Sequence, residues 1–129
     1  MESKKLTKAE EQVMQYLWKL KKGFLKDIVE QYPEPRPAYT TVSTVIRVLV
    51  KKGAIGHNTY GKIHEYYPLV AKKAYFRGQV KSIVKDFFNG STPEFASCFT
   101  DGQLDLSELE EIRKLVDDNI DRIKSKRNQ

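Results

Sequence analysis

The stretch that most constrains the fold is residues 39–53, YTTVSTVIRVLVKKG. At helical spacing it divides into two faces. One face is an apolar stripe made of Val42, Val45, Ile46 and Leu49. The other face is short, polar and cationic, without a carboxylate, and is made of Thr40, Ser43, Thr44, Arg47 and Lys51. Gly53 predicts the left-handed residue that closes a helix. The sequence therefore predicts one rigid amphipathic helix here.

The polar face of this helix suits the major groove of DNA. Small hydroxyl side chains can reach base edges or phosphates, and Arg47 can bind a guanine through two parallel hydrogen bonds. An ordinary surface helix of a small domain could carry the same residues. The segments on either side of the helix are therefore needed to choose between the two interpretations.

The segment before this helix predicts two further helices. Thr7 to Glu10 forms a capping box, and an apolar period leads from there to Gly23, which is expected to end the helix. Phe24 and Leu25 read as a short extended piece, and residues 26–32 as a brief helix. Prolines 33, 35 and 37 then exclude regular structure. A short helix, a proline-rich turn and a basic helix are typical of a helix-turn-helix.

A β-hairpin is predicted directly after the basic helix. Residues 54–57 and 63–67 read as strands, and residues 58–62 (NTYGK) as the loop between them. That loop would offer Asn58, Thr59, Tyr60 and Lys62 to a nearby nucleic-acid backbone or minor groove. The fold class is thus mostly α with a small β-hairpin wing, and residues 1–70 are predicted to be a winged-helix DNA-binding domain.

Residues 71–129 are predicted to be a helical dimerisation domain. Helices are expected over 70–88 and 94–100, and Ser107 to Glu110 reads as the capping box of a last helix. These residues are too few to bury two apolar stripes alone, so we expect a second copy to cover them. The alternative is that the helices fold back on the first domain. The side chains expected at the dimer surface are Phe76, Val80, Ile83, Phe87, Leu109, Ile112, Val116 and Ile120.

Charge and composition fit a nucleic-acid partner. The net charge is +6, with 12 Lys and Arg against 7 Asp and Glu in residues 1–70 and 11 against 10 afterwards. The basic excess therefore accompanies the residue 39–53 helix. One cysteine, Cys98, excludes an internal disulfide and fits a reducing compartment. No apolar run reaches the length of a membrane span, so we expect a cytoplasmic protein without membrane insertion.

Enzymatic chemistry finds little support in the sequence. His57 and His64 have no metal-ligand spacing and are expected to be structural or to contact phosphate. Cys98, among Phe95, Ala96 and Phe99, reads as a small buried residue rather than a nucleophile. No phosphate-binding glycine motif or nucleophile elbow occurs. We predict no catalytic residues, no metal and no cofactor. A winged-helix protein–protein adaptor without nucleic-acid binding remains the alternative function.

Four stretches together resemble the penicillinase repressor family of bacterial winged-helix regulators. They are LTKAEEQVMQYLW (6–18), TTVSTVIRVLVKKG (40–53), GKIHEYYPLV (61–70) and LSELEEIRKL (106–115). The resemblance covers essentially the whole chain. It implies a homodimer that binds a palindromic operator and represses transcription of genes such as those for antibiotic resistance. It also places Thr40, Thr41, Ser43, Thr44 and Arg47 in the recognition helix and Lys62 in the wing.

The resemblance further implies release by proteolysis, triggered by a membrane sensor with a metalloprotease domain. The family's cut between Asn and Phe aligns with Cys98-Phe99, which lacks the Asn. Pro37-Ala38 replaces the family's Trp-Ser before the recognition helix, so Thr40 or Thr41 is expected to provide the cap instead. Arg47-Val48 also departs from the common pattern, which predicts a different operator preference.

Overall fold

The computed structural model describes residues 5–128, and its contacts divide the chain into two compact units, Met1–Lys81 and Ser82–Gln129. The first unit contains α1 (Lys8–Leu20), β1 (Gly23–Phe24), α2 (Leu25–Glu30), α3 (Tyr39–Lys51), β2 (Ile55–Tyr60) and β3 (Ile63–Pro68). Helix α4 (Lys72–Phe87) runs from the first unit into the second, which also holds α5 (Thr92–Thr100) and α6 (Leu106–Arg127). None of the described helices is long and apolar enough to cross a membrane.

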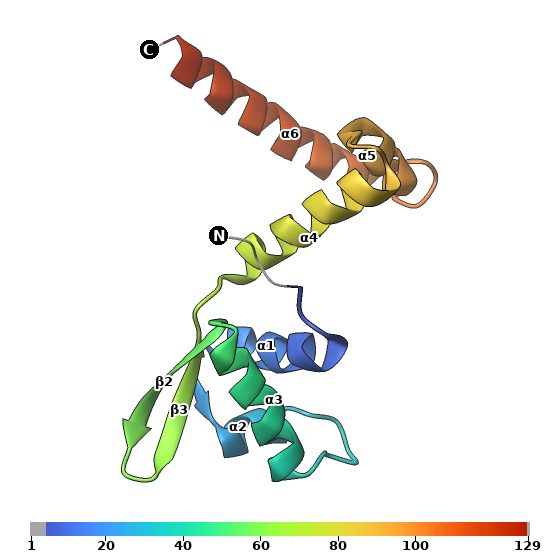
Figure 1. Cartoon of the computed structure of the whole chain (residues 1–129). Helices are drawn as coiled ribbons and strands as arrows, with labels where there is room; N and C mark the ends of the chain where they lie inside the picture. The colour runs from blue at the N-terminus through green and yellow to red at the C-terminus, as the bar shows by residue number, and fades with distance from the viewer. Residues whose placement is uncertain (1–4, 129) are drawn as a thin grey trace. The chain divides into compact units, whose positions relative to one another are not determined.

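Three helices and a small sheet enclose the core of the first unit (Figure 1). Its largest fully buried side chains come from every helix of the unit before α4 and from β2: Met14, Leu17, Ile28, Ile46, Leu49 and Ile55. The three strands are antiparallel in the order β1-β3-β2, and His57 pairs with Tyr66. The predicted winged helix-turn-helix is confirmed as the fold of this unit.

Helix ends confirm some predicted caps and correct others. The capping box of Thr7 and Glu10 is present, and Gly53 (φ +80°) closes α3 while the N–H of Ala54 donates to the Leu49 carbonyl. Helix α1, however, ends at Leu20 with Lys21 in a positive-φ conformation (+72°), so Gly23 is free to begin β1. The prediction that Gly23 ends α1 was wrong because the chain leaves the helix two residues earlier, at Lys21.

In the second unit the cap of α6 differs from the predicted one, whereas that of α5 lies at the expected serine. Asp105 and Glu108 form the capping box of α6, so this helix begins before the predicted Ser107. Ser91 caps α5 by accepting a hydrogen bond from the N–H of Glu94. Aspartate satisfies free backbone N–H groups as well as serine does, and the two candidates lie only two residues apart. The sequence pattern therefore could not choose between them.

The turn of the wing is shorter than predicted. Strand β2 continues to Tyr60 and β3 begins at Ile63, which leaves Gly61 and Lys62 as the whole turn. Gly61 has φ +62°, the conformation that a glycine at the first central position of a type II′ hairpin turn provides. Asn58, Thr59 and Tyr60 therefore lie in a strand, and Lys62 alone of the predicted polar tip residues remains in the turn.

The first turns of α4 pack on the winged helix. Tyr75 is 2% exposed, and the ring centroid of Phe76 lies 5.7 Å from that of Trp18. The indole N–H of Trp18 also donates to the carbonyl of Val70 at 2.8 Å. The first unit therefore extends beyond residue 70, where the sequence placed the end of the first domain. For Tyr75 and Phe76 the fold-back alternative is correct, so Phe76 has no place in the dimer surface proposed below.

Candidate nucleic-acid interface

Helix α3 presents its polar face to solvent, as the sequence predicted. Val42, Ile46 and Leu49 are at most 1% exposed, because this stripe packs against α1 and α2. On the opposite side four of the predicted contact residues are exposed and one, Ser43, is half-buried; the exposed ones are Thr40, Thr44, Arg47 and Lys51. Thr41 is exposed as well. The structure thus brings the predicted α3 residues onto one accessible surface.

The N-terminus of α3 has no side-chain cap. Ala38 occupies the cap position, and the Thr44 hydroxyl donates to the Thr40 carbonyl at 2.9 Å. The expectation that Thr40 or Thr41 would cap the helix was therefore wrong. Within the described residues, the backbone N–H groups of Tyr39 and Thr40 have no hydrogen-bond acceptor. With no acidic residue in the first turn, this helix end favours an anion such as a phosphate.

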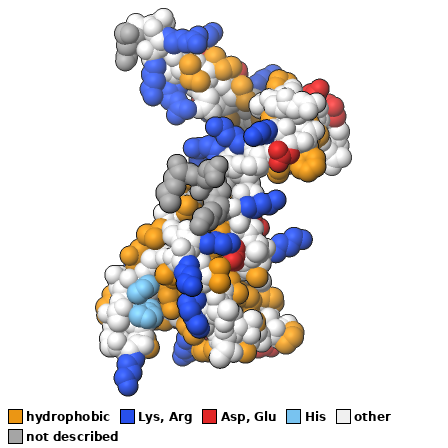
Figure 2. Space-filling view, viewed as in Figure 1, with side chains coloured by type: hydrophobic (Ala, Val, Ile, Leu, Met, Phe, Trp, Pro, Cys, Tyr) orange, Lys and Arg blue, Asp and Glu red, His pale blue; other side chains and the backbone are white. Residues whose placement is uncertain are grey.

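The wing lies beside α3, and its tip points to the same end of the first unit as the N-terminus of α3 (Figure 1). Lys62 is exposed in the two-residue turn at this tip. Figure 2 shows Lys and Arg side chains at the tip and beside the two histidines of the wing. The helix and the hairpin therefore form one cationic surface, which we call the α3–wing surface and which is made of Thr40, Thr41, Ser43, Thr44, Arg47, Lys51 and Lys62.

His57 and His64 belong to the edge of this surface. The pairing of His57 with Tyr66 and of Thr59 with His64 places these four side chains on one face of the hairpin. The two imidazole centroids are 4.4 Å apart. The sequence suggested a structural role or a phosphate contact for each histidine separately, but not that they form a pair. The register of the hairpin brings the two histidines together. The sequence did not predict this register because the predicted turn, residues 58–62, was too long.

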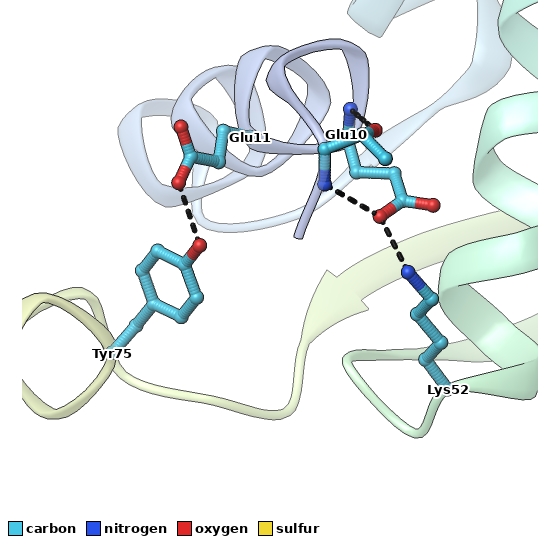
Figure 3. A network of polar contacts seen from close by, with 5 residues as sticks. Glu10, Glu11, Lys52 and Tyr75 are labelled. Atoms are coloured by element: carbon cyan, nitrogen blue, oxygen red, sulfur yellow. Dashed lines mark hydrogen bonds and ion pairs between the residues drawn. The ribbon is translucent and has the colours of Figure 1, made fainter. Parts of the chain in front are cut away.

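A polar network holds α3 and α4 against α1 (Figure 3). Glu10, 6% exposed, accepts a 2.7 Å hydrogen bond from Lys52 at the end of α3. Burial alone would raise the pKa of Glu10, but hydrogen bonds from Lys52 and from the Thr7 backbone outweigh it and leave the pKa below its ordinary value. The adjacent Glu11 accepts a 2.6 Å hydrogen bond from the Tyr75 hydroxyl of α4. Both helices are thus anchored to consecutive residues of α1.

Alkaline pH is expected to weaken the first unit through Tyr75. Burial, followed by the hydrogen bond to Glu11, raises the pKa of Tyr75 from 10.0 to about 12. Between these values the unfolded chain loses the proton first, so the free energy of unfolding should fall by at most about 3 kcal/mol. Tyr75→Phe should show a flatter pH dependence over this range. Urea unfolding followed by the fluorescence of Trp18 measures both; identical pH dependence in the two proteins would contradict the assignment.

The second unit leaves many large apolar side chains in solvent. In the second half of α4, Ile83 and Phe87 of this unit are 41% and 78% exposed, and Val80, which lies just before the unit begins, is 40% exposed. On α6, Leu109 and Ile112 are half-buried, while Val116 and Ile120 are 49% and 42% exposed. Phe88, Phe95 and Phe99 pack edge to face, but α5 and α6 contain no buried residue. Exposed apolar side chains gathered along a helix often mark a protein–protein surface.

Cys98 and Phe99 lie inside α5, near its end. Cys98 is exposed and Phe99 is 37% exposed, so the prediction of a buried cysteine was wrong. The ring of Phe95 packs edge to face against those of Phe88 and Phe99. Among residues 5–128 no three His, Cys, Asp or Glu side chains come together as a metal site.

The order of elements and the exposed α3–wing surface define a winged helix-turn-helix protein. Residues 6–118 match the penicillinase repressor family, and the chain belongs to this family. It is 24% identical over 121 residues to a penicillinase repressor of Bacillus licheniformis, covering 92% of this chain and 94% of the relative. It is 27% identical over 113 residues to the methicillin resistance regulatory protein MecI of Mammaliicoccus sciuri, covering 86% and 92%.

Two solved structures are also similar to part of the chain. One is the solution structure of the DNA binding domain of the repressor BlaI, with a TM-score of 0.49 and 25% identity. It covers 55% of this chain and 88% of its own. The other is the CopR repressor, with a TM-score of 0.44 and 31% identity over 52% of this chain and 99% of its own.

Proposed function

We propose that this protein is a homodimeric transcriptional repressor that binds a palindromic DNA operator. The observation that supports this most is the exposed face of α3, which is polar and cationic and carries no carboxylate. A rigid helix with this face can enter the major groove, where Arg47 would bind guanine and the threonines would contact bases or phosphates. Membership of the penicillinase repressor family supports the same function.

The wing and the N-terminus of α3 would fix the helix in the groove. Lys62 at the hairpin tip would contact the backbone of the adjacent groove, and the uncapped N–H groups of Tyr39 and Thr40 would receive a phosphate. Such contacts hold a protein in register on DNA but read no sequence. Base preference is therefore assigned to α3, and general affinity to the wing.

A second copy of the chain would cover the apolar faces of α4 and α6. The proposed dimer surface consists of Val80, Ile83, Phe87, Leu109, Ile112, Val116 and Ile120. A two-fold dimer would present two α3 helices to half-sites about 34–36 Å apart, one turn of duplex. A palindromic operator matches this symmetry. The palindromic operator and the two-fold dimer are therefore proposed together.

Release by proteolysis belongs to this proposal as well. Family membership supports a membrane sensor metalloprotease as the trigger, with Cys98-Phe99 as the candidate cleavage site. A protease requires extended backbone, and this bond lies within α5. Helix α5 buries no residue completely, so it can open locally at small cost. Cleavage there would separate the winged helix from α6 and weaken operator binding.

Binding to DNA at increasing salt tests the proposed function. The full chain is titrated onto duplexes from upstream of its own gene and onto random-sequence duplexes. A repressor should bind its operator tightly, and the logarithm of the affinity should fall linearly with the logarithm of salt concentration. No binding even at low salt would contradict the proposal and favour a protein–protein adaptor instead.

Arg47 and Lys62 are expected to contribute in different ways. Arg47→Ala should cost about 1–3 kcal/mol on the operator and relax base preference at one position. Lys62→Ala should weaken operator and random duplexes alike and reduce the salt slope by about one. Quantitative gel shifts with both duplexes measure the four affinities. Wild-type binding by both variants would show that these contacts are misplaced.

A further inference from the structure

The two histidines of the wing form a pair that faces α3. Their imidazole centroids are 4.4 Å apart and the ring planes are inclined by 54°. The Nδ1 atom of His64 is 3.0 Å from the Thr59 hydroxyl oxygen, so this contact fixes the ring and leaves Nε2 available. His57 is exposed and His64 is half-buried. Both rings are therefore accessible to a ligand.

A small hollow lies between this pair and α3. Its volume is about 130 Å³, well above the roughly 30 Å³ that one water occupies in the liquid. Helix α3 lines it with Ser43, Ile46, Arg47 and Val50, and the wing lines it with His57, His64 and Tyr66. Every polar side chain in this lining can donate a hydrogen bond, and none is a carboxylate. The polar part of the hollow therefore suits an anion.

The charged and titratable groups around the pair are all cationic or neutral. Arg47 faces it from α3 and Tyr66 from β3. Burial raises the pKa of the Tyr66 phenol, while the nearby charge of Arg47 acts to lower it, which agrees with a guanidinium close to the hollow. Glu65 alternates to the other face of β3, where the Tyr60 hydroxyl contacts it at 3.5 Å. Figure 2 shows the histidines exposed on the same face as neighbouring Lys and Arg side chains.

We propose that this hollow binds one backbone phosphate of DNA, and that the His57–His64 pair takes up a proton when it does. The assignment rests on the proposed function and deepens it. A phosphate between the rings favours protonation of the pair, because an imidazolium donates a charge-assisted hydrogen bond to the anion. Arg47 keeps its role toward the bases.

Proton uptake makes DNA affinity depend on pH in a fixed direction. Binding is tighter where the imidazoles can carry charge, so the affinity rises as pH falls through the range in which histidine titrates. If one proton is taken up on binding, the DNA affinity can change by at most roughly tenfold per pH unit. We expect the affinity to be about three- to tenfold higher at about pH 6 than at about pH 8. Because a phosphate is contacted, random-sequence duplexes should show the same slope.

The test measures the affinity of the full chain for a random-sequence duplex across this pH range, at constant salt and with EDTA. The chain has only two histidines, so His57→Gln/His64→Gln contains none. This variant should lose the pH dependence and bind more weakly than wild type near pH 6. Asn58→Ala, on the other face of β2, is the matched control and should keep the slope.

Imidazole proton NMR gives a second readout that needs no variant. Two resonances report two histidines, and both titration midpoints should move to higher pH when the duplex is bound. Unmoved midpoints, a wild-type affinity independent of pH, or a slope that survives in the double variant would each overturn the assignment. Failure to bind DNA at any pH would overturn the proposed function as well, whereas pH-independent binding would overturn the histidine site alone.

Discussion

Ile120→Asp is expected to convert the protein to a monomer and to lower operator affinity by about 10²–10⁴-fold. Ile120 is 42% exposed and follows Leu109, Ile112 and Val116 along the apolar row of α6. In a dimer this row would be buried, and an unpaired carboxylate there is strongly unfavourable. Operator affinity should fall because a monomer binds one half-site only. In the dimer, binding of one half-site raises the effective concentration of the second α3 helix at the other.

The neighbouring residue provides the matched control. Asn119 is exposed, and its side-chain oxygen accepts a 2.7 Å hydrogen bond from Arg122. Asn119→Asp adds the same charge to the same turn of α6 while it keeps this hydrogen bond. Light scattering should show monomers for Ile120→Asp and dimers for wild type and Asn119→Asp. A wild type that is itself monomeric, or an Ile120→Asp dimer with full operator affinity, would contradict the proposed dimer surface.

Leu49→Ala should lower the free energy of unfolding of the first unit by about 2–5 kcal/mol. Leu49 is 0% exposed on the buried side of α3, so its truncation removes apolar contacts and leaves a cavity. Val48 precedes it and is 38% exposed. Val48→Ala should therefore change stability by only about 0.5 kcal/mol, as surface substitutions usually do. The difference in stability between the two variants tests which face of α3 is buried.

The fluorescence of Trp18 can be used to measure the stability of the Leu49→Ala and Val48→Ala variants. Trp18 is the only tryptophan of the chain and packs within the first unit against Tyr75 and Phe76. Its fluorescence in urea therefore follows the unfolding of the winged helix. Equal losses of stability in the two alanine variants would mean that the apolar stripe of α3 is not the buried side, and that its polar face is not the exposed one.

The elements that the sequence predicted best are those in which local pattern and tertiary packing agree. Helix α3 is the clearest case, because its apolar stripe and its closing Gly53 specify the same helix that α1 and α2 bury. The hairpin of the wing was predicted from the glycine and asparagine in residues 58–62, but the length of its turn was not predicted correctly. The two-residue turn depends on Gly61 alone, whereas Asn58 is an equally good turn residue by composition.

The less successful predictions concern contacts between distant residues. Tyr75 lies 64 residues after Glu11 along the chain and still donates a hydrogen bond to it, which no local pattern encodes. The same holds for the ring of Phe76 against Trp18. The histidine pair required the correct hairpin register before it could be recognised. Periodicity in the sequence was thus enough to predict the polar face of α3. The residues around that face could be identified only from the three-dimensional fold.

Amide chemical-shift mapping with operator DNA tests the central claim most directly, because it identifies the surface of the full chain that meets DNA. The account predicts the largest changes at the N-terminus of α3, along its outer face to Arg47 and Lys51, and at Gly61 and Lys62 of the wing. The buried stripe and the exposed polar faces of α6 should change little. Changes that spare α3 and the wing while DNA binds elsewhere would contradict the account.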